Sequence, residues 1–232
     1  MNLAVVAGCG DAKANLFDLA RGEFHGTAFC IARDLFITAA HVYEAAASYG
    51  EVALSRLTPG RQQTQTVREF EVFPDIDIAL LRCPNLWAEI LPFNFDPLYY
   101  LTDVVALGFA FGLELSGEEG ESHVHQLRAF KGHVMTRRAL SMVPSMPPGY
   151  EVSFVPPPGL SGSPLLLPQG NQFVVTGVVL KHHTAELEER KMDLGLALDA
   201  VELLAIDSTI VGGSLAERVF GRPKPTPRTR RP

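Results

Sequence analysis

Short apolar runs separated by turns constrain the fold of this chain more than any other feature. The runs are rich in Val, Ile, Leu and Phe, and Gly, Pro and polar residues lie between them. This pattern is typical of many short strands joined by tight turns, and it predicts an all-β fold with barrels or a sandwich. The predicted strands are 27–32, 35–39, 51–57, 78–82, 104–109, 126–135, 151–155, 163–167, 173–180 and 194–198.

Two segments favour a helix instead. One is 42–47, directly after His41, and the other is 200–205, where the apolar residues fall on one face at helical spacing. The second segment is expected to close the fold as a short C-terminal helix. The strand pattern breaks at 92–101, which predicts a boundary near residue 98.

We therefore expect an N-terminal unit over 1–98 and a second unit over 99–211. The remaining residues, 212–232, are rich in proline and arginine and are predicted to form a disordered tail, because they bury little apolar surface. Weak contacts of this basic tail with nucleic acid or an acidic partner are the alternative to a simply solvated end.

Composition excludes several classes of protein. With 47% hydrophobic residues in 232 the chain can bury a sizeable core, whereas its net charge of −6 gives no general attraction to nucleic acid or to anionic membranes. No apolar run is long enough to span a bilayer, and the N-terminus is a poor secretory signal. Cys9, Cys30 and Cys83 have no metal-site or disulfide spacing. We expect reduced thiols, no metal, no cofactor and a cytoplasmic location.

The segment from Pro158 to Pro164 predicts a nucleophile. Gly159 and Gly162 flank Ser161 and let the backbone turn sharply, which would expose the serine hydroxyl. The backbone N–H groups of Gly159 and Ser161 are then the expected oxyanion hole. By itself, a turn of small residues between two strands would give the same pattern.

His41 adds a candidate general base. It follows the strand-like LFITAA and precedes the helix-compatible VYEAAA, so its ring can face a cleft from the end of a strand. Histidine side chains in general can accept and donate a proton near neutral pH, so His41 is suited to take the Ser161 proton and pass it to a leaving amine. The other histidines lack this context.

Asp77 is the expected partner of His41. It directly precedes the apolar run that starts at Ile78, and a carboxylate at that position is costly unless it is paired. An imidazole N–H would satisfy it and select the ring tautomer. Asp75 is the rival carboxylate, but it lies further from the strand start. The order His41, Asp77, Ser161 makes the three sites a candidate triad.

At these residues the chain resembles the trypsin-like serine peptidases. TAAH, DIAL and GLSGSP resemble the three signature blocks of that family, in its order. VVALGFAFG resembles the strand that opens the second barrel of bacterial Deg-type proteases, and FVVTGVVL and LGLALDAVELLA resemble the pocket strand and the final strand with its helix. The resemblance covers about 20–207. It implies two packed six-stranded antiparallel β-barrels, with the triad between them and acyl-enzyme hydrolysis of peptide bonds.

Departures from the family pattern refine this expectation. Leu160 stands where animal trypsins have the aspartate that pairs with a newly cut N-terminus, so no such activation switch is expected. The stretch from Ile210 to Gly213 mimics that N-terminus by coincidence. The disulfide that usually brackets the catalytic histidine is missing, and the PDZ domain that Deg-type proteases usually add is not expected. These features resemble bacterial or intracellular members, including glutamyl endopeptidases.

The same resemblance predicts the substrate-binding residues. Val155 takes the position at the base of the specificity pocket, so no carboxylate is there to select Lys or Arg. Val179 replaces the histidine of glutamyl endopeptidases, and Leu180 follows it on the pocket strand. An apolar or small residue before the cleaved bond is the expectation, and His182 and His183 could line the rim.

The expected function is limited processing of a protein or peptide substrate by a serine endopeptidase. Two alternatives differ in class. A catalytically silent binding module could retain the cleft, although it would not need a complete triad. An α/β-hydrolase would require the order Ser, acid, His and a strand-to-helix elbow, and this chain shows the reverse order. The natural substrate and the oligomeric state stay open.

Overall fold

Strands make up most of the fold, as the sequence predicts. The computed structural model describes residues 3–9, 23–58, 61–86, 90–110, 113–117, 120–124, 126–138, 148–187 and 190–221. The first half contains β1 (Leu3–Cys9), β2 (Glu23–Ala32), β3 (Leu35–Ala39), α1 (Ala40–Ser48), β4 (Glu51–Thr58), β5 (Arg61–Thr66), β6 (Glu69–Phe73), the 3-10 helix η1 (Pro74–Ile76) and β7 (Ile78–Arg82).

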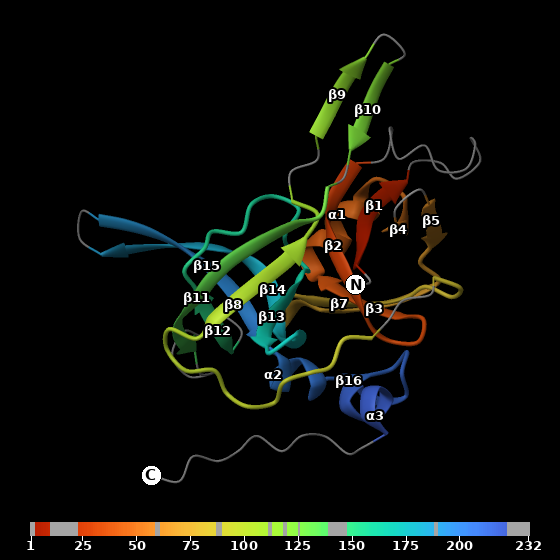
Figure 1. Cartoon of the computed structure of the whole chain (residues 1–232). Helices are drawn as coiled ribbons and strands as arrows, with labels where there is room; N and C mark the ends of the chain where they lie inside the picture. The colour runs from red at the N-terminus through yellow and green to blue at the C-terminus, as the bar shows by residue number, and fades with distance from the viewer. Residues whose placement is uncertain are drawn as a thin grey trace.

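The second half also consists mainly of strands. It follows the linker, by which we mean the residues between β7 and β8. It contains β8 (Asp103–Gly108), β9 (Leu113–Gly117), β10 (Gly120–Val124), β11 (Arg128–Arg138), β12 (Gly149–Val152), β13 (Pro164–Gln169), β14 (Gln172–Leu187), β15 (Arg190–Asp199), α2 (Ala200–Leu204), β16 (Asp207–Ser208), β17 (Gly213–Ser214) and α3 (Leu215–Phe220). Figure 1 shows the two halves side by side, with the C-terminal helices below them.

The first half is one antiparallel sheet of seven strands in the order β5-β4-β1-β2-β3-β7-β6. All five residues of β3 are buried, because β3 lies inside the sheet between β2 and β7. A strand buried on both faces reads as a continuous apolar run, which explains why 35–39 and 78–82 were predicted with their observed bounds.

The second half closes into a six-stranded barrel of β11-β12-β15-β14-β13-β8. The all-β fold with barrel-like halves is therefore confirmed, but the first half is a curled seven-stranded sheet instead of a closed six-stranded barrel. The sequence analysis did not predict β1, β5 and β6 in the first half, or β9, β10, β16 and β17 in the second. β5 and β6 are the edge strands of the sheet, and β5 has the polar sequence RQQTQT, so no apolar run marks it.

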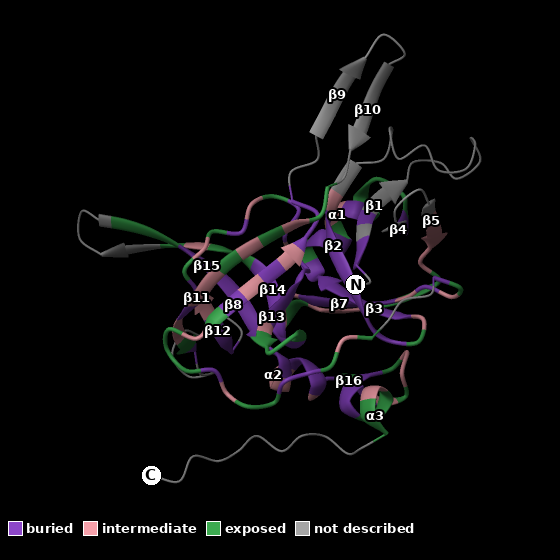
Figure 2. Cartoon of the chain, in the orientation of Figure 1, coloured by how far each residue is buried: buried purple, intermediate pink, exposed green. Residues whose placement is uncertain are grey.

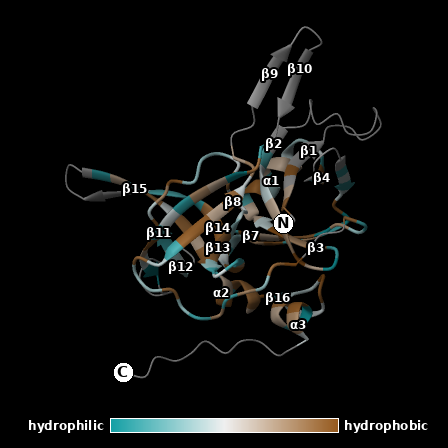
Figure 3. Ribbon diagram, in the orientation of Figure 1, coloured by the Kyte–Doolittle hydropathy of each residue, from teal (hydrophilic) through white to brown (hydrophobic). Residues whose placement is uncertain are grey.

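A shared core joins the halves. One cluster of buried residues contains Phe29 and Leu80 from the first sheet together with Val178 and Leu198 from the barrel. In Figure 2 the buried colour is concentrated on β3, β7 and β14, and in Figure 3 the hydrophobic colour continues into α2. The two halves thus pack through apolar side chains, which holds any site at their junction in place.

The C-terminal residues fold further than the sequence predicts. The helix α3 lies inside 212–232, the range predicted as a disordered tail. Ser214 and Glu217 form a reciprocal capping box at its start, and Leu215 and Ala216 are buried. The capping pattern and the two buried residues explain why the fold extends to Gly221, and the rest of the predicted tail lies outside the described residues.

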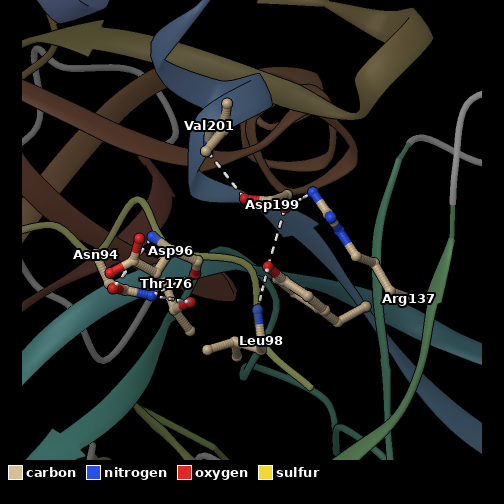
Figure 4. A network of polar contacts seen from close by, with 8 residues as sticks. Asn94, Asp96, Leu98, Arg137, Thr176, Asp199 and Val201 are labelled. Atoms are coloured by element: carbon tan, nitrogen blue, oxygen red, sulfur yellow. Dashed lines mark hydrogen bonds and ion pairs between the residues drawn. The ribbon is translucent and has the colours of Figure 1, made fainter. Parts of the chain in front are cut away.

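Polar contacts attach the linker to the second barrel (Figure 4). The buried Asp199 carboxylate accepts hydrogen bonds from Val201 N at 2.9 Å, from the Tyr150 hydroxyl at 2.9 Å and from Arg137 at 3.3 Å. Leu98 N donates to the Tyr150 oxygen at 3.4 Å. The predicted boundary near residue 98 falls within this attached linker.

None of the helices in the described part of the chain is both long enough and apolar enough to cross a membrane.

Candidate active site

The strand-to-helix junction between β3 and α1 positions His41. Ala39 has an extended conformation and is the N-cap of α1, which begins at Ala40, so His41 is the second helical residue. Its side chain is 44% exposed, so the ring can be reached by solvent or substrate. A histidine at a helix start, facing outward, can exchange protons with a bound molecule.

Asp77 contacts both the ring and the backbone of His41. Its two carboxylate oxygens each lie 3.0 Å from His41 Nδ1, and Oδ1 also accepts the His41 backbone N–H at 3.1 Å. The Asp77 carbonyl accepts the N–H of Ala40 at 3.0 Å. Both contacts satisfy first-turn N–H groups of α1, which lack partners within the helix and favour a negative charge.

The two rival carboxylates occupy different surroundings. Asp77 lies between η1 and β7, and its side chain is only 16% exposed. Its backbone is in the left-handed region, with φ 56°. Asp75 lies within η1 and is exposed. The structure therefore places Asp77 against His41, and it does not place Asp75 there.

Ser161 is the second residue in the second of two consecutive tight turns. Leu160 N donates to the carbonyl of Pro157 at 3.1 Å, and Ser163 N donates to the carbonyl of Leu160 at 3.1 Å. The third residue of each turn is a glycine with positive φ, 89° at Gly159 and 82° at Gly162, as a type II turn requires. A side chain at Gly162 would also collide with the carbonyl of Thr27, at 2.1 Å.

The predicted oxyanion donors, Gly159 N–H and Ser161 N–H, make no backbone hydrogen bond among the described residues. The Ser161 residue is partly exposed, whereas Ser163 is fully buried. N–H groups that are not used in backbone hydrogen bonds are available to stabilise a developing oxyanion, and burial makes Ser163 less suited than Ser161 to act as a nucleophile.

The Ser161 turn and the His41 helix meet at Gly26. A Cβ atom at Gly26 would lie 2.7 Å from the Val42 side chain and 2.9 Å from the Ser161 carbonyl. Val42 follows His41 on α1, so this close approach puts the serine turn next to the start of the helix. The structure thus brings His41, Asp77 and the Ser161 turn together at the junction of the two halves.

The predicted substrate-binding residues separate into two kinds. Val155 is 45% exposed, whereas the side chains of Val179 and Leu180 are fully buried in the core. The backbone of Val179 instead holds the serine turn, because its carbonyl accepts Gly162 N at 2.8 Å and its N–H donates to Ser163 at 2.8 Å. Only Val155 of the three therefore offers its side chain at the surface.

The strand β14 departs from regular pairing beside this turn. Its register against β15 shifts between Val179 and His182. On β15, a Cβ atom at Gly195 would lie 2.5 Å from the Phe154 carbonyl and 3.0 Å from Pro156 Cδ, so the segment before the serine turn packs tightly on the barrel. His182 is exposed and His183 is partly exposed.

The two cysteines whose side chains the structure describes are buried and poorly suited to act as nucleophiles. Cys30 and Cys83 are buried free thiols, and burial raises the pKa of each to about 12. A thiol that stays protonated is a poor nucleophile. Among the described residues, no group of His, Cys, Asp and Glu side chains is arranged to hold a metal ion.

Sequence reasoning missed Thr27 and Thr38, two fully buried threonines behind the serine turn. Thr27 N–H donates to the Ser161 carbonyl at 2.9 Å, and the Thr38 hydroxyl donates to the Thr27 carbonyl at 2.9 Å. Both threonines lie in predicted strands that are otherwise apolar. A buried hydroxyl needs a hydrogen-bond partner, so this pattern could have indicated that they bind another part of the chain.

The fold and this site define a class of hydrolase in which a serine turn from one barrel meets a histidine and an aspartate from the other half. The family model of the trypsin-like peptidase domain matches residues 26–178. The chain belongs to this family and is a trypsin-like serine protease, a hydrolase of peptide bonds.

Solved structures agree with the fold. The active form of the Rv3671c protease from M. tuberculosis is 22% identical over 96% of this chain and 82% of that chain, with a TM-score of 0.61. An inactive form of the same protease is 22% identical over 94% of this chain and 87% of that chain, with a TM-score of 0.56. At this level of identity the likeness establishes the architecture alone. A comparison with curated proteins finds no match.

Proposed function

We propose that this protease cleaves peptide bonds through His41, Asp77 and Ser161. The observation that carries the proposal is the Asp77 carboxylate, with both oxygens 3.0 Å from His41 Nδ1, beside the Ser161 turn. A carboxylate at Nδ1 keeps the proton on that nitrogen and leaves Nε2 free to accept one.

In the proposed first step, Ser161 Oγ attacks the carbonyl carbon of the substrate while His41 Nε2 takes the hydroxyl proton. The carbonyl oxygen becomes an oxyanion, which accepts hydrogen bonds from the backbone N–H groups of Gly159 and Ser161. The C–N bond then breaks as His41 gives its proton to the leaving amine. Water attacks the resulting acyl-enzyme by the same proton transfers, which releases the acid and restores Ser161.

For the substrate, we propose a small or apolar residue before the cleaved bond. The exposed Val155 side chain is apolar, and it lies beside the buried Pro156. Limited processing of a partner protein, the cytoplasmic location and the closer likeness to Deg-type or glutamyl endopeptidases stay predictions. N-terminal sequencing of fragments from a proteome treated with the enzyme would identify the cleavage preference.

The nucleophile is tested by labelling with a fluorophosphonate probe. Ser161→Ala should lose labelling and lose peptide hydrolysis by several orders of magnitude. Ser163→Ala is the matched control two residues away, and it should keep both, because the Ser163 hydroxyl is fully buried and has no hydrogen-bond partner among the residues that the structure describes.

Labelling that persists in Ser161→Ala would refute this nucleophile. A wild-type protein that binds peptides but neither labels nor hydrolyses them would favour the silent binding module instead.

A further inference from the structure

Thr27 connects the first half of the fold to both sides of the nucleophile. Its hydroxyl donates to the Gly159 carbonyl at 2.9 Å, and its backbone N–H donates to the Ser161 carbonyl at 2.9 Å. We propose that Thr27 is a positioning residue for the oxyanion hole, an inference that rests on the function proposed above.

The hydroxyl has a defined direction. Phe109 N–H, just after β8, donates to Thr27 Oγ1 at 2.9 Å. Because that N–H can only donate, Oγ1 is the acceptor there, and its own proton is available for the Gly159 carbonyl. Thr27 is fully buried, so no bulk water competes for either bond.

These bonds hold the two peptide planes on either side of the Leu160–Ser161 peptide, which is the plane that carries the Ser161 N–H. The Gly159 carbonyl shares a peptide plane with Leu160 N–H, which is held by Pro157. Hydrogen bonds therefore hold both polar groups of that plane: Thr27 binds the Gly159 carbonyl, and Pro157 binds the Leu160 N–H. In the next plane the Leu160 carbonyl accepts Ser163 N–H, so the Ser161 N–H on the opposite edge points away from the turn.

The packing around Thr27 leaves little room for another arrangement. A Cβ atom at Gly108 would lie 2.8 Å from Thr27 Oγ1 and 2.0 Å from Ser163 Oγ, and one at Gly162 would lie 2.1 Å from the Thr27 carbonyl. Two segments of the second half, one ending β8 and one in the serine turn, thus approach Thr27 closely. The hydroxyl is the one side-chain group of Thr27 that can fix the Gly159 carbonyl.

Valine has nearly the shape of threonine and lacks the hydroxyl. Thr27→Val would leave the Gly159 carbonyl and the Phe109 N–H without this partner, and the Gly159 peptide could then rotate. The oxyanion donors act mainly in the transition state, so their misplacement should slow bond formation more than it weakens initial binding.

The experiment measures the rate of labelling at increasing fluorophosphonate concentrations up to saturation. The concentration dependence separates the maximal rate constant kinact from the half-saturation constant KI. In this reaction Ser161 Oγ forms a bond to phosphorus, fluoride leaves, His41 takes the proton, and the phosphoryl oxygen occupies the oxyanion position. For Thr27→Val we expect kinact to fall about tenfold to a hundredfold, with KI within about twofold of wild type. Thr27→Ser should restore kinact.

A matched control removes a buried threonine hydroxyl elsewhere. Thr176 is 1% exposed, and its hydroxyl accepts a hydrogen bond from Asn94 in the linker at 3.4 Å. Thr176→Val should keep the wild-type kinact. If Thr27→Val does not fold, the pair Thr27→Ser and Thr27→Ala gives the same comparison, since these variants differ by the oxygen alone.

Three results would overturn the proposal: wild-type kinact in folded Thr27→Val, equal loss in the serine and alanine variants, or equal loss in Thr176→Val. Absence of labelling in the wild-type protein would instead refute the proposed function, so the two failures are distinguishable.

Discussion

At the scale of single residues, Asp77 serves the helix and the imidazole together. The same Oδ1 lies 3.1 Å from the His41 backbone N–H and 3.0 Å from its ring nitrogen. The ring is thereby held relative to its own backbone, and the N-terminus of α1 gains the negative charge that its free N–H groups favour.

Asp77→Asn should lower peptide hydrolysis by about four orders of magnitude near neutral pH, because an amide favours the wrong His41 tautomer. Stability should change little, since asparagine also caps helices well. Steady-state kinetics and thermal unfolding of the same sample check the two effects.

The exposed Asp75 supplies the control for this prediction. Asp75→Asn should retain hydrolysis within about twofold, as is usual for a surface substitution outside the site. A large loss in Asp75→Asn, with activity kept in Asp77→Asn, would show that the choice between these carboxylates was wrong.

At the scale of elements, Glu71 on β6 holds the segment that follows α2. Its carboxylate accepts hydrogen bonds from the Ser208 hydroxyl at 2.6 Å, from Thr209 N at 2.8 Å and from the Thr209 hydroxyl at 3.0 Å. Arg82 on β7 donates to the carbonyl of Ile210. These bonds tie the C-terminal elements back to the edge of the first sheet.

Folding should therefore depend on the Glu71 charge. Burial alone would raise the pKa of this carboxyl, but the hydrogen bonds from Ser208, Thr209 and Ile210 outweigh it and hold the pKa below its ordinary value. The folded state then binds the proton more weakly than the unfolded state. The stabilisation is present above the ordinary glutamate pKa and is lost as the pH falls through the lowered value.

Chemical unfolding at several pH values tests this linkage. Glu71→Gln should unfold more easily than wild type at neutral pH, and the difference should shrink as the pH falls through the folded pKa of Glu71. Glu51→Gln, at an exposed end of β4, serves as the control and should show no such convergence. A Glu71→Gln deficit that stays constant with pH would contradict the role of the charge.

At the scale of the whole molecule, strands from both halves support the Ser161 turn. Leu160 is fully buried before Ser161, where animal trypsins carry the aspartate of the activation switch. The turn around it is held by Thr27 from β2 and by Val179 from β14. The consecutive prolines before Gly159 restrict the backbone further and reduce the entropy lost on ordering.

The uncut chain should accordingly react with a fluorophosphonate without prior proteolysis. Labelling of the intact protein is compared with that of samples trimmed at successive N-terminal positions, with mass spectrometry to confirm each N-terminus. Labelling that appears only after trimming, in proportion to a new N-terminus, would mean that another carboxylate takes the place of the missing aspartate.

Local patterns in the sequence determined the strand content, the bounds of the most buried strands and the choice of candidate residues. The runs 35–39 and 78–82 read clearly because strands buried on both faces are continuously apolar. Asp77 could be preferred over Asp75 because it directly precedes such a run. Glycines around Ser161 indicated a sharp turn, and the observed positive φ values explain them.

Only the tertiary structure decided the features that depend on partners far apart in the chain. Edge strands such as β5 carry no apolar run. Val179 and Leu180 were expected to bind substrate, but their side chains are buried in the core. The hydrogen bond from Thr27 to Gly159 joins residues 132 positions apart. The periodicity of a sequence indicates which face of one element a residue occupies. It does not indicate which distant segment packs on that face, and the bond from Thr27 to Gly159 depends on such packing.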